Sequence, residues 1–293
     1  MSRRADSALV RVAPWAFILI WASGYVVAKA AAPHAEPLTF LLLRYGGVIV
    51  LMTSLAVVAR APWPATWREA AHIAIAGIGI QAVYLGGVWV AIRHGMPAGV
   101  AALIVNLQPV LTAVAGRFVG ERVVARQWLG LALGFVGVAL VVWSKVTTTG
   151  LGTGTVMLAV AALLAMTSAT LYQKRFCPHF DLRTGQVIQF AASVVVTLPF
   201  AFATESFRIE WNASVIGAML WSIFVLTGGG ISLLFLMIRH GAATQVTGYM
   251  YLVPAVTALL AWLMFGERLA ATAIAGMGVT IAGVALVVRR TTR

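Results

Sequence analysis

The chain has 293 residues, of which 61% are hydrophobic and only 10% are charged, and its formal net charge is +13. About a quarter of the residues of a soluble domain are charged, so this composition excludes a water-soluble protein, and the positive charge is better explained by membrane topology than by nucleic acid. The apolar residues come in runs of about 20, the length that a helix needs to cross a lipid bilayer. The composition therefore predicts an all-α membrane protein that crosses the bilayer several times.

Ten apolar segments lie between charged residues, prolines and glycines. They cover residues 13–31, 38–59, 70–92, 96–119, 126–144, 152–173, 184–204, 213–238, 242–265 and 270–288. The first run, of 19 residues, is longer than the apolar part of a signal peptide, which is about 7–15 residues. We therefore expect it to be kept as the first of ten transmembrane helices, and an even number of helices places both termini on one side.

The distribution of positive residues predicts which side that is. Cytoplasmic loops of membrane proteins carry an excess of lysine and arginine. If both termini are cytoplasmic, 15 of the 21 lysines and arginines lie on the cytoplasmic side and 4 on the opposite side, with Lys29 and Arg44 inside the spans. The bias predicts a multi-pass protein of the cytoplasmic (inner) membrane with both termini in the cytoplasm.

An internal repeat divides the chain into two similar halves. Three motifs recur 146 positions later, namely IRHG at 92–95, GER at 120–122 and GVALVV at 137–142. The repeat predicts two units of five helices, residues 1–146 and 147–293. Because five is odd, the second unit enters the membrane in the opposite orientation, and inverted repeats of this kind are typical of transporters that bind a solute near the midplane. We therefore expect two inverted five-helix repeats around a central cavity.

The sequence resembles the EamA-type carriers of the drug/metabolite transporter superfamily over nearly its whole length. The resemblance rests on WASGYVVAK in the first span, LRYGG in the second, NLQPV in the fourth and the two GER turns. Within the superfamily the chain is most similar to YddG-type exporters of aromatic amino acids. The resemblance implies a central cavity lined by the first, third, fourth, sixth, eighth and ninth helices, with the fifth and tenth in support.

Aromatic and amide side chains within the spans are the candidate substrate-binding residues. Polar groups at this depth are costly unless they serve a site or a partner helix, and aromatic rings with a few amides suit a flat solute. The candidates are Trp21, Tyr25, Gln81, Tyr84, Trp89, Asn106, Gln108, Tyr249 and Lys29. Each mid-span aromatic ring has packing as its alternative role. Tryptophans near the predicted interfaces, Trp15 among them, are expected to be membrane-belt residues.

Three further features have structural interpretations. Lys29 ends the first span, where it either complements the helix dipole and reaches the headgroups or attracts a substrate carboxylate. Arg44, whose repeat mate is Gln189, is expected to pair with Glu36 or to extend outward rather than to contact substrate. A face of small residues, Gly130, Gly134 and Gly137, predicts close helix packing in the fifth span.

The acidic residues limit the mechanism. All eight lie in predicted loops or termini, whereas proton relays in transporters use acidic or histidine side chains within the membrane. The chain also has no G-x-x-x-x-G-K-[S/T] phosphate loop, so we expect no use of ATP. We also expect no cofactor and no metal. The function expected is export of a small organic metabolite, most of all aromatic amino acids. Alternatives are export of other metabolites or cationic drugs, an intramembrane enzyme, or a structural subunit, and the oligomeric state is left open.

Overall fold

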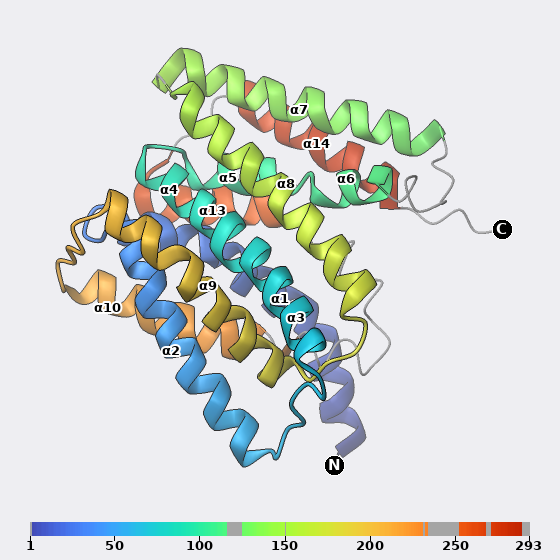
Figure 1. Ribbon diagram of the computed structural model, residues 1–293. Coiled ribbons are helices and arrows are strands. Elements are labelled where there is room, and N and C mark those ends of the chain that lie inside the picture. Colours follow the sequence, from blue (N-terminus) through green and yellow to red (C-terminus); the bar gives the residue numbers. More distant parts are fainter. Residues whose placement is uncertain are drawn as a thin grey trace. The chain divides into compact units, whose positions relative to one another are not determined.

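The computed structural model describes residues 2–115, 125–149, 151–230, 232–233, 252–267 and 271–288, and these residues are almost entirely helical (Figure 1). Their helices are α1 (Ser2–Ala31), α2 (Pro37–Val58), α3 (Trp67–Gly77), η1 (Ile78–Leu85), α4 (Gly86–Arg93), α5 (Ala98–Val105), α6 (Gln108–Ala115), α7 (Ala125–Thr149), α8 (Thr153–Phe176), α9 (Leu182–Thr204), α10 (Ala213–Leu220), η3 (Trp221–Gly229), α13 (Val253–Phe265) and α14 (Ala271–Val288). Within this part of the chain the extended pairing is limited to one isolated bridge, between Ala35 and Ile209.

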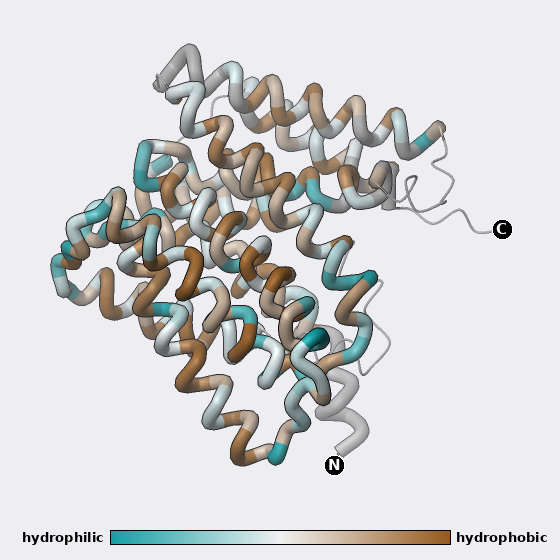
Figure 2. Tube along the Cα trace, viewed as in Figure 1, coloured by the Kyte–Doolittle hydropathy of each residue, from teal (hydrophilic) through white to brown (hydrophobic). Residues whose placement is uncertain are grey.

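The helices fall on the ten predicted spans. Among the described residues, five helices are long and apolar enough to cross a bilayer, and five further apolar helices of 10–17 residues occupy the fourth, fifth, eighth, ninth and tenth predicted spans. Hydrophilic residues gather mostly at helix ends and in the connecting segments (Figure 2). The all-α membrane fold expected from the composition is confirmed, and the main difference is that α1 begins at Ser2, before the apolar part of its span.

Side-chain caps fix the starts of three helices. The hydroxyl of Thr66 accepts a hydrogen bond from the Glu69 amide at 3.2 Å, and the Glu69 carboxylate accepts one from the Ala65 amide at 2.9 Å. This arrangement is close to the reciprocal capping box. Asn212 caps α10 by accepting from the Val215 amide at 2.9 Å, and Asp181 does the same for α9. The caps satisfy amides that a helix start leaves without intrahelical partners.

The third and eighth spans each contain a π-helical segment that the sequence analysis did not predict. These are η1 in the third span and η3 in the eighth, so the segments occupy equivalent parts of the two repeats. Hydroxyl groups of neighbouring helices donate to carbonyls of the third span, from Tyr45 to Gln81 at 2.6 Å and from Ser193 to Gly77 at 3.2 Å. Such wide turns occur often at functional sites.

The chain forms two compact units that cut across the sequence repeats. The first holds Met1–Val26, Pro97–Gly152 and Gly229–Arg293, and the second holds Val27–Met96 and Thr153–Gly228. Each unit therefore combines helices from both predicted halves. The division at residues 146 and 147 concerns sequence similarity, which is a different property from compactness, and it stays a prediction.

In the first unit, α7 and α14 run side by side with glycines at their contact (Figure 1). A Cβ atom placed on Gly137 would lie 2.5 Å from the Gly276 carbonyl oxygen, and one placed on Gly283 would lie 2.6 Å from the Gly130 carbonyl oxygen. Real side chains essentially never come so close, so these positions require glycine. The small-residue face predicted in the fifth span is confirmed as a helix-packing surface.

In the second unit, α2 and α9 pack through large side chains. The rings of Tyr45 and Phe190 are 5.4 Å apart, and both side chains are almost fully buried, with 0% and 1% exposed surface. The ring of Phe40 in α2 stacks on the ring of Trp89 in α4, with centroids 4.6 Å apart. The core of this unit is therefore aromatic.

The glycine contacts between α7 and α14 relate residues of the two halves of the sequence reciprocally. Gly137 meets Gly276, and the equivalent pair, Gly130 with Gly283, meets as well. Reciprocal contacts of this kind are the property of a two-fold interface, in which the same patch serves both partners. The equivalent helices α7 and α14 therefore pack on each other through equivalent glycines.

Candidate functional site

The predicted aromatic stripe of the first span forms on α1. The rings of Phe17 and Trp21 are in contact, with centroids 5.6 Å apart. Phe17 and Tyr25 are buried, with 4% and 5% of their surface exposed, while Trp21 is partly exposed. The Thr257 hydroxyl of α13 donates to the Ala22 carbonyl at 3.4 Å, which fixes α13 against this part of α1. Trp21 is therefore the ring of the stripe that retains accessible surface.

Lys29 occupies the last turn of α1, as predicted. Its side chain is partly exposed, and it belongs to the second unit. A cation in this turn complements the helix dipole, so the position agrees with the structural role. It also leaves the predicted contact with a substrate carboxylate open, and both roles stay predictions.

The three candidates of the third span have different surroundings. Gln81 and Tyr84 lie on η1, where the Gln81 carbonyl accepts the hydrogen bond from Tyr45. Tyr84 is buried with 8% exposed surface, and Trp89 with 4%. Because Trp89 uses one face of its ring to stack on Phe40, its packing role is evident, while its contact with substrate stays a prediction.

The amides of the fourth span lie where its helix is interrupted. Asn106 is the C-cap of α5, and the chain makes a turn at Asn106 and Leu107 before α6 begins at Gln108. The interruption precedes Pro109, which has no amide hydrogen to donate. Asn106 is buried with 7% exposed surface, and Gln108 is partly exposed. The helix of the fourth span is therefore interrupted next to Pro109.

The described candidate residues fall into two groups. Trp21, Tyr25, Asn106 and Gln108 belong to the first unit, and Lys29, Gln81, Tyr84 and Trp89 belong to the second. Tyr249 lies outside the described residues. In the part of the chain that the structure describes, no group of three or more His, Cys, Asp or Glu side chains is placed to hold a metal ion.

Arg44 is placed differently from the expectation. It does not pair with Glu36 or extend outward, because its guanidinium group is enclosed between α2, α9 and η3. The Nη2 atom lies 3.5 Å from the Thr227 hydroxyl, and the guanidinium carbon lies 6.0 Å from the Phe190 ring centroid. Only 8% of the residue is exposed. Sequence reasoning missed this because both neighbours are more than 140 positions away along the chain.

One end of the second unit is closed by acidic residues that bind backbone amides. The Glu36 carboxylate accepts hydrogen bonds from the amides of Ser206 at 3.0 Å and Arg208 at 2.8 Å. Burial raises the pKa of Glu36, but these bonds and the charge of Arg208 outweigh it, so the pKa lies below its ordinary value. Glu205 accepts from the Leu38 and Thr39 amides at 2.8 and 2.7 Å. The loops after the first and seventh spans therefore share one end, as the predicted topology requires.

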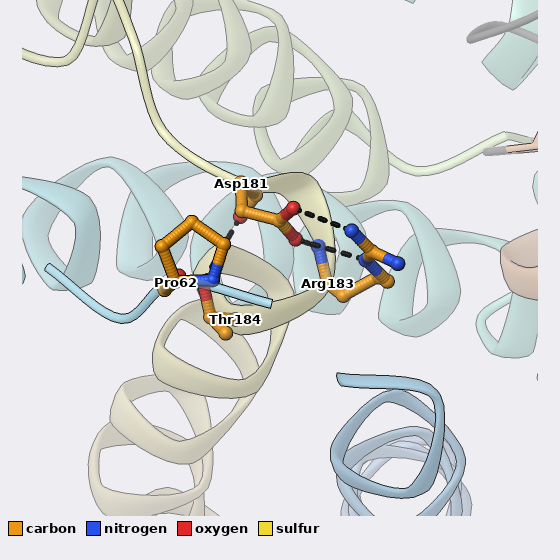
Figure 3. Close-up of polar contacts among 4 residues, drawn as sticks. All are labelled: Pro62, Asp181, Arg183 and Thr184. Atoms are coloured by element: carbon orange, nitrogen blue, oxygen red, sulfur yellow. Dashed lines mark hydrogen bonds and ion pairs between the residues drawn. The ribbon is translucent and has the colours of Figure 1, made fainter. Parts of the chain in front are cut away.

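The opposite end of α2 brings together the loops after the second and sixth spans. The Thr184 hydroxyl donates to the Pro62 carbonyl at 2.9 Å, and Arg183 pairs with Asp181 at 2.7 Å (Figure 3). The bond from Arg183 holds the pKa of Asp181 below its ordinary value. A cavity of about 460 Å³ between these loops is lined by Trp63, Phe176 and Phe180, among others. It lies where these loops meet the ends of the spans, and none of the candidate residues lines it.

Comparison with known proteins gives the family. The sequence profile of the EamA-like transporter family matches residues 13–143 and 153–289. A Bacillus subtilis (strain 168) transporter, YvbV, is 28% identical over 92% of this chain and 88% of its own length. A Salmonella typhimurium protein named "Probable amino-acid metabolite efflux pump" is 26% identical over 91% of this chain and 90% of its own length.

Two further comparisons agree. The inner membrane transporter YedA of Escherichia coli (strain K12) is 25% identical over 93% of this chain and 88% of its own length. A solved crystal structure with 16% identity has a TM-score of 0.65 and covers 95% of this chain and 96% of its own, which shows the fold. The chain therefore belongs to the EamA-like transporter family, and it is a multi-pass membrane transporter rather than an enzyme.

Proposed function

We propose that this transporter exports amino acids, aromatic ones most readily, across the cytoplasmic membrane. The observation that carries the substrate class is the set of aromatic and amide side chains within the spans, Trp21, Tyr84 and Asn106 among them. Aromatic rings recognise a flat side chain by stacking, and amides orient the polar end of a solute. Two relatives from Salmonella typhimurium and Escherichia coli are named for efflux of amino-acid metabolites, which supports the same class.

The proposed mechanism is alternating access without ATP. Two inverted halves can adopt each other's conformations, so a site near the midplane opens to one side and then to the other. The described acids, Glu36, Glu69, Asp181, Glu205, Glu210 and Glu267, lie at or beyond the ends of the spans. This favours facilitated exit down a concentration gradient over coupling through a carboxylate inside the membrane.

Uptake into proteoliposomes tests the substrate class. Labelled phenylalanine, tyrosine and tryptophan are compared with labelled alanine and a quaternary amine, first without an ion gradient and then with an imposed proton gradient. We expect saturable aromatic uptake without any gradient. Transport of the quaternary amine with no aromatic uptake would replace the proposed substrate with cationic drugs, and strict dependence on the proton gradient would replace the facilitative mechanism.

Cysteine labelling tests the proposed orientation with cytoplasmic termini. In a Cys177→Ser background, a cysteine is introduced at Ala65 or at Ser206, both of which are exposed and lie in loops at opposite ends of the second unit. A membrane-impermeant maleimide applied to intact cells should label the cysteine at position 206 and leave the one at position 65 unlabelled until the cells are opened. The reverse pattern would place the termini outside.

A further inference from the structure

Arg44 is a buried cation inside a membrane span. It is the eighth residue of α2, which begins at Pro37, and at 1.5 Å per residue it lies about 10 Å along the helix. Only 8% of its surface is exposed. Ionisable side chains at such depth are costly, and in membrane proteins they mark solute or ion pathways, usually with a partner of opposite charge.

The protein groups around Arg44 leave its charge poorly compensated. The Nε atom is buried and has no hydrogen-bond partner. The Nη2 contact with Thr227, at 3.5 Å, is longer than an ordinary hydrogen bond. The titratable groups that interact with the guanidinium are the phenols of Tyr45 and Tyr84, and no described carboxylate is among them. The Nε–Nη2 edge is therefore the least satisfied part of the side chain.

The acidic residues at the near end of α2 form hydrogen bonds with backbone amides and not with Arg44. Glu36 binds the amides of Ser206 and Arg208, and Glu205 binds the first amides of α2. A buried charge whose partner is missing destabilises a protein strongly. The Nε–Nη2 edge of Arg44 would therefore be stabilised by an anion, and the described protein groups do not supply one.

The fold itself does not require this charge. The repeat mate of Arg44 is Gln189, which occupies the equivalent place on α9 and is 2% exposed. Its amide donates to the Gln173 side chain at 3.0 Å, so the equivalent position carries a neutral group with an ordinary partner. The charge breaks the symmetry of the two repeats, as a group that contacts an asymmetric solute would do.

We propose that Arg44 binds the carboxylate of the transported solute through its Nε–Nη2 edge. A guanidinium edge offers two parallel N–H donors in the geometry that a carboxylate accepts, and the Nε donor is unused. The Thr227 hydroxyl of η3 lies beside it, so one of the two π-helical segments borders this group. The proposal rests on the proposed function, since it assigns the recognition of one end of the amino acid.

The test compares two ligands that share a ring and differ in charge. The purified full-length protein in detergent is titrated with phenylacetate and with phenylacetamide, and binding is followed by the thermal unfolding midpoint. The variant Arg44→Gln introduces the residue that the fold already holds at the mate position. Arg68→Gln is the matched control, because Arg68 belongs to the same unit and is exposed. Lys29→Met tests the alternative cation.

We expect the wild type to bind phenylacetate at least about tenfold more tightly than phenylacetamide, since hydrogen bonds to charged groups are worth about 10- to 100-fold in affinity. Arg44→Gln should lose that advantage and keep the affinity for phenylacetamide, whereas Arg68→Gln should keep both. Arg44→Lys, which retains the charge without the planar fork, should keep part of the preference, and it replaces Arg44→Gln if that variant does not fold.

Three outcomes would overturn the proposal. The first is that Arg44→Gln retains the preference for phenylacetate. The second is that it lowers the affinity for both ligands equally, which would indicate that Arg44 has a packing role. The third is that only Lys29→Met loses the preference for phenylacetate, which would show that Lys29, and not Arg44, binds the carboxylate. Failure of the proposed substrate is distinguishable: if no aromatic amino acid is transported and Arg44→Gln still removes the preference, Arg44 remains an anion site and only the substrate is revised.

Discussion

The two pairs of repeat mates, α7 with α14 and α2 with α9, solve the same packing problem in opposite ways. In the first pair, backbones approach at glycines and leave no room for a Cβ atom. In the second pair, the large rings of Tyr45 and Phe190 meet, and the buried guanidinium group of Arg44 lies over the Phe190 ring. The first arrangement suits a fixed support, and the second contains polar groups whose hydrogen bonds can be exchanged. We infer that the difference separates scaffold from solute-handling parts of the transporter.

Replacing a glycine at the α7–α14 contact should have the largest effect on stability. In Gly137→Ala the new Cβ would lie 2.5 Å from the Gly276 carbonyl oxygen, and overpacking of this kind costs about 1–3 kcal/mol. The thermal unfolding midpoint of the purified protein should fall by several degrees. Gly278→Ala on α14 is the control, because nothing lies within 4 Å of that position. Equal midpoints for the two variants would show that the helices are not held by this glycine contact.

Removing the cap that α9 supplies to α2 should have the next largest effect. Glu205 accepts bonds from the Leu38 amide and from the Thr39 amide and hydroxyl, at 2.8, 2.7 and 2.7 Å. Glu205→Ala leaves these donors at a helix start, and we expect a loss of about 2 kcal/mol. Glu210→Ala should change the unfolding midpoint very little, since the Glu210 carboxylate is 75% exposed. A similar loss in both variants would argue against the capping role.

Tyr45→Phe should have a smaller effect that is specific to the α2–α9 pair. The change keeps the ring contact with Phe190 and removes the hydroxyl that donates to the Gln81 carbonyl of η1. A net loss of about 1 kcal/mol is expected for one hydrogen bond. Uptake by proteoliposomes should change together with the unfolding midpoint if η1 takes part in transport. Unchanged values of both would mean that the bond is dispensable.

Glu36 should give the smallest effect, visible as a dependence on pH. Its pKa in the folded protein lies below the ordinary value of 4.5, so the folded state favours the ionised form. Its contribution to stability is therefore complete above pH 4.5 and is lost as the pH falls through the folded pKa. The unfolding midpoint of Glu36→Gln should therefore depend less on pH than that of the wild type when the pH is lowered from neutral to about 3. If the midpoints of the wild type and of Glu36→Gln fell in parallel with pH, Glu36 would not contribute to the pH dependence of stability.

Much of the fold could be predicted from the sequence because it follows from local composition. Long apolar runs give spanning helices, and the small-residue face of the fifth span indicated its close packing. The recurrence of IRHG, GER and GVALVV gave the repeat. The π-helical segments were not foreseen, and neither were the hydroxyl groups of Tyr45 and Ser193 that reach carbonyls of the third span from other helices.

The candidate site was less predictable than the fold. Tyr25 is buried and Asn106 ends a helix within its span, while the predicted contact of both with substrate stays a prediction. The position of Arg44 does not agree with the sequence-based expectation, because a sequence shows the nearest acid along the chain, Glu36, and not the Thr227 hydroxyl of η3. The sequence did contain one indication, because Arg44 is matched by the neutral Gln189 in the second repeat, so the fold that the repeats share does not need this charge.

The measurement that tests the central claim most directly is tryptophan uptake by Trp21→Ala and Trp15→Ala in proteoliposomes. Both residues lie on α1, but Trp21 belongs to the candidate site and Trp15 is 54% exposed and predicted to be a belt residue. Trp21→Ala should lower kcat/KM for tryptophan by about fivefold and affect alanine little, because a stacked ring contributes about 1 kcal/mol. Trp15→Ala should stay near the wild type. Equal losses in the two variants, or equal losses for tryptophan and alanine, would contradict aromatic recognition at this site.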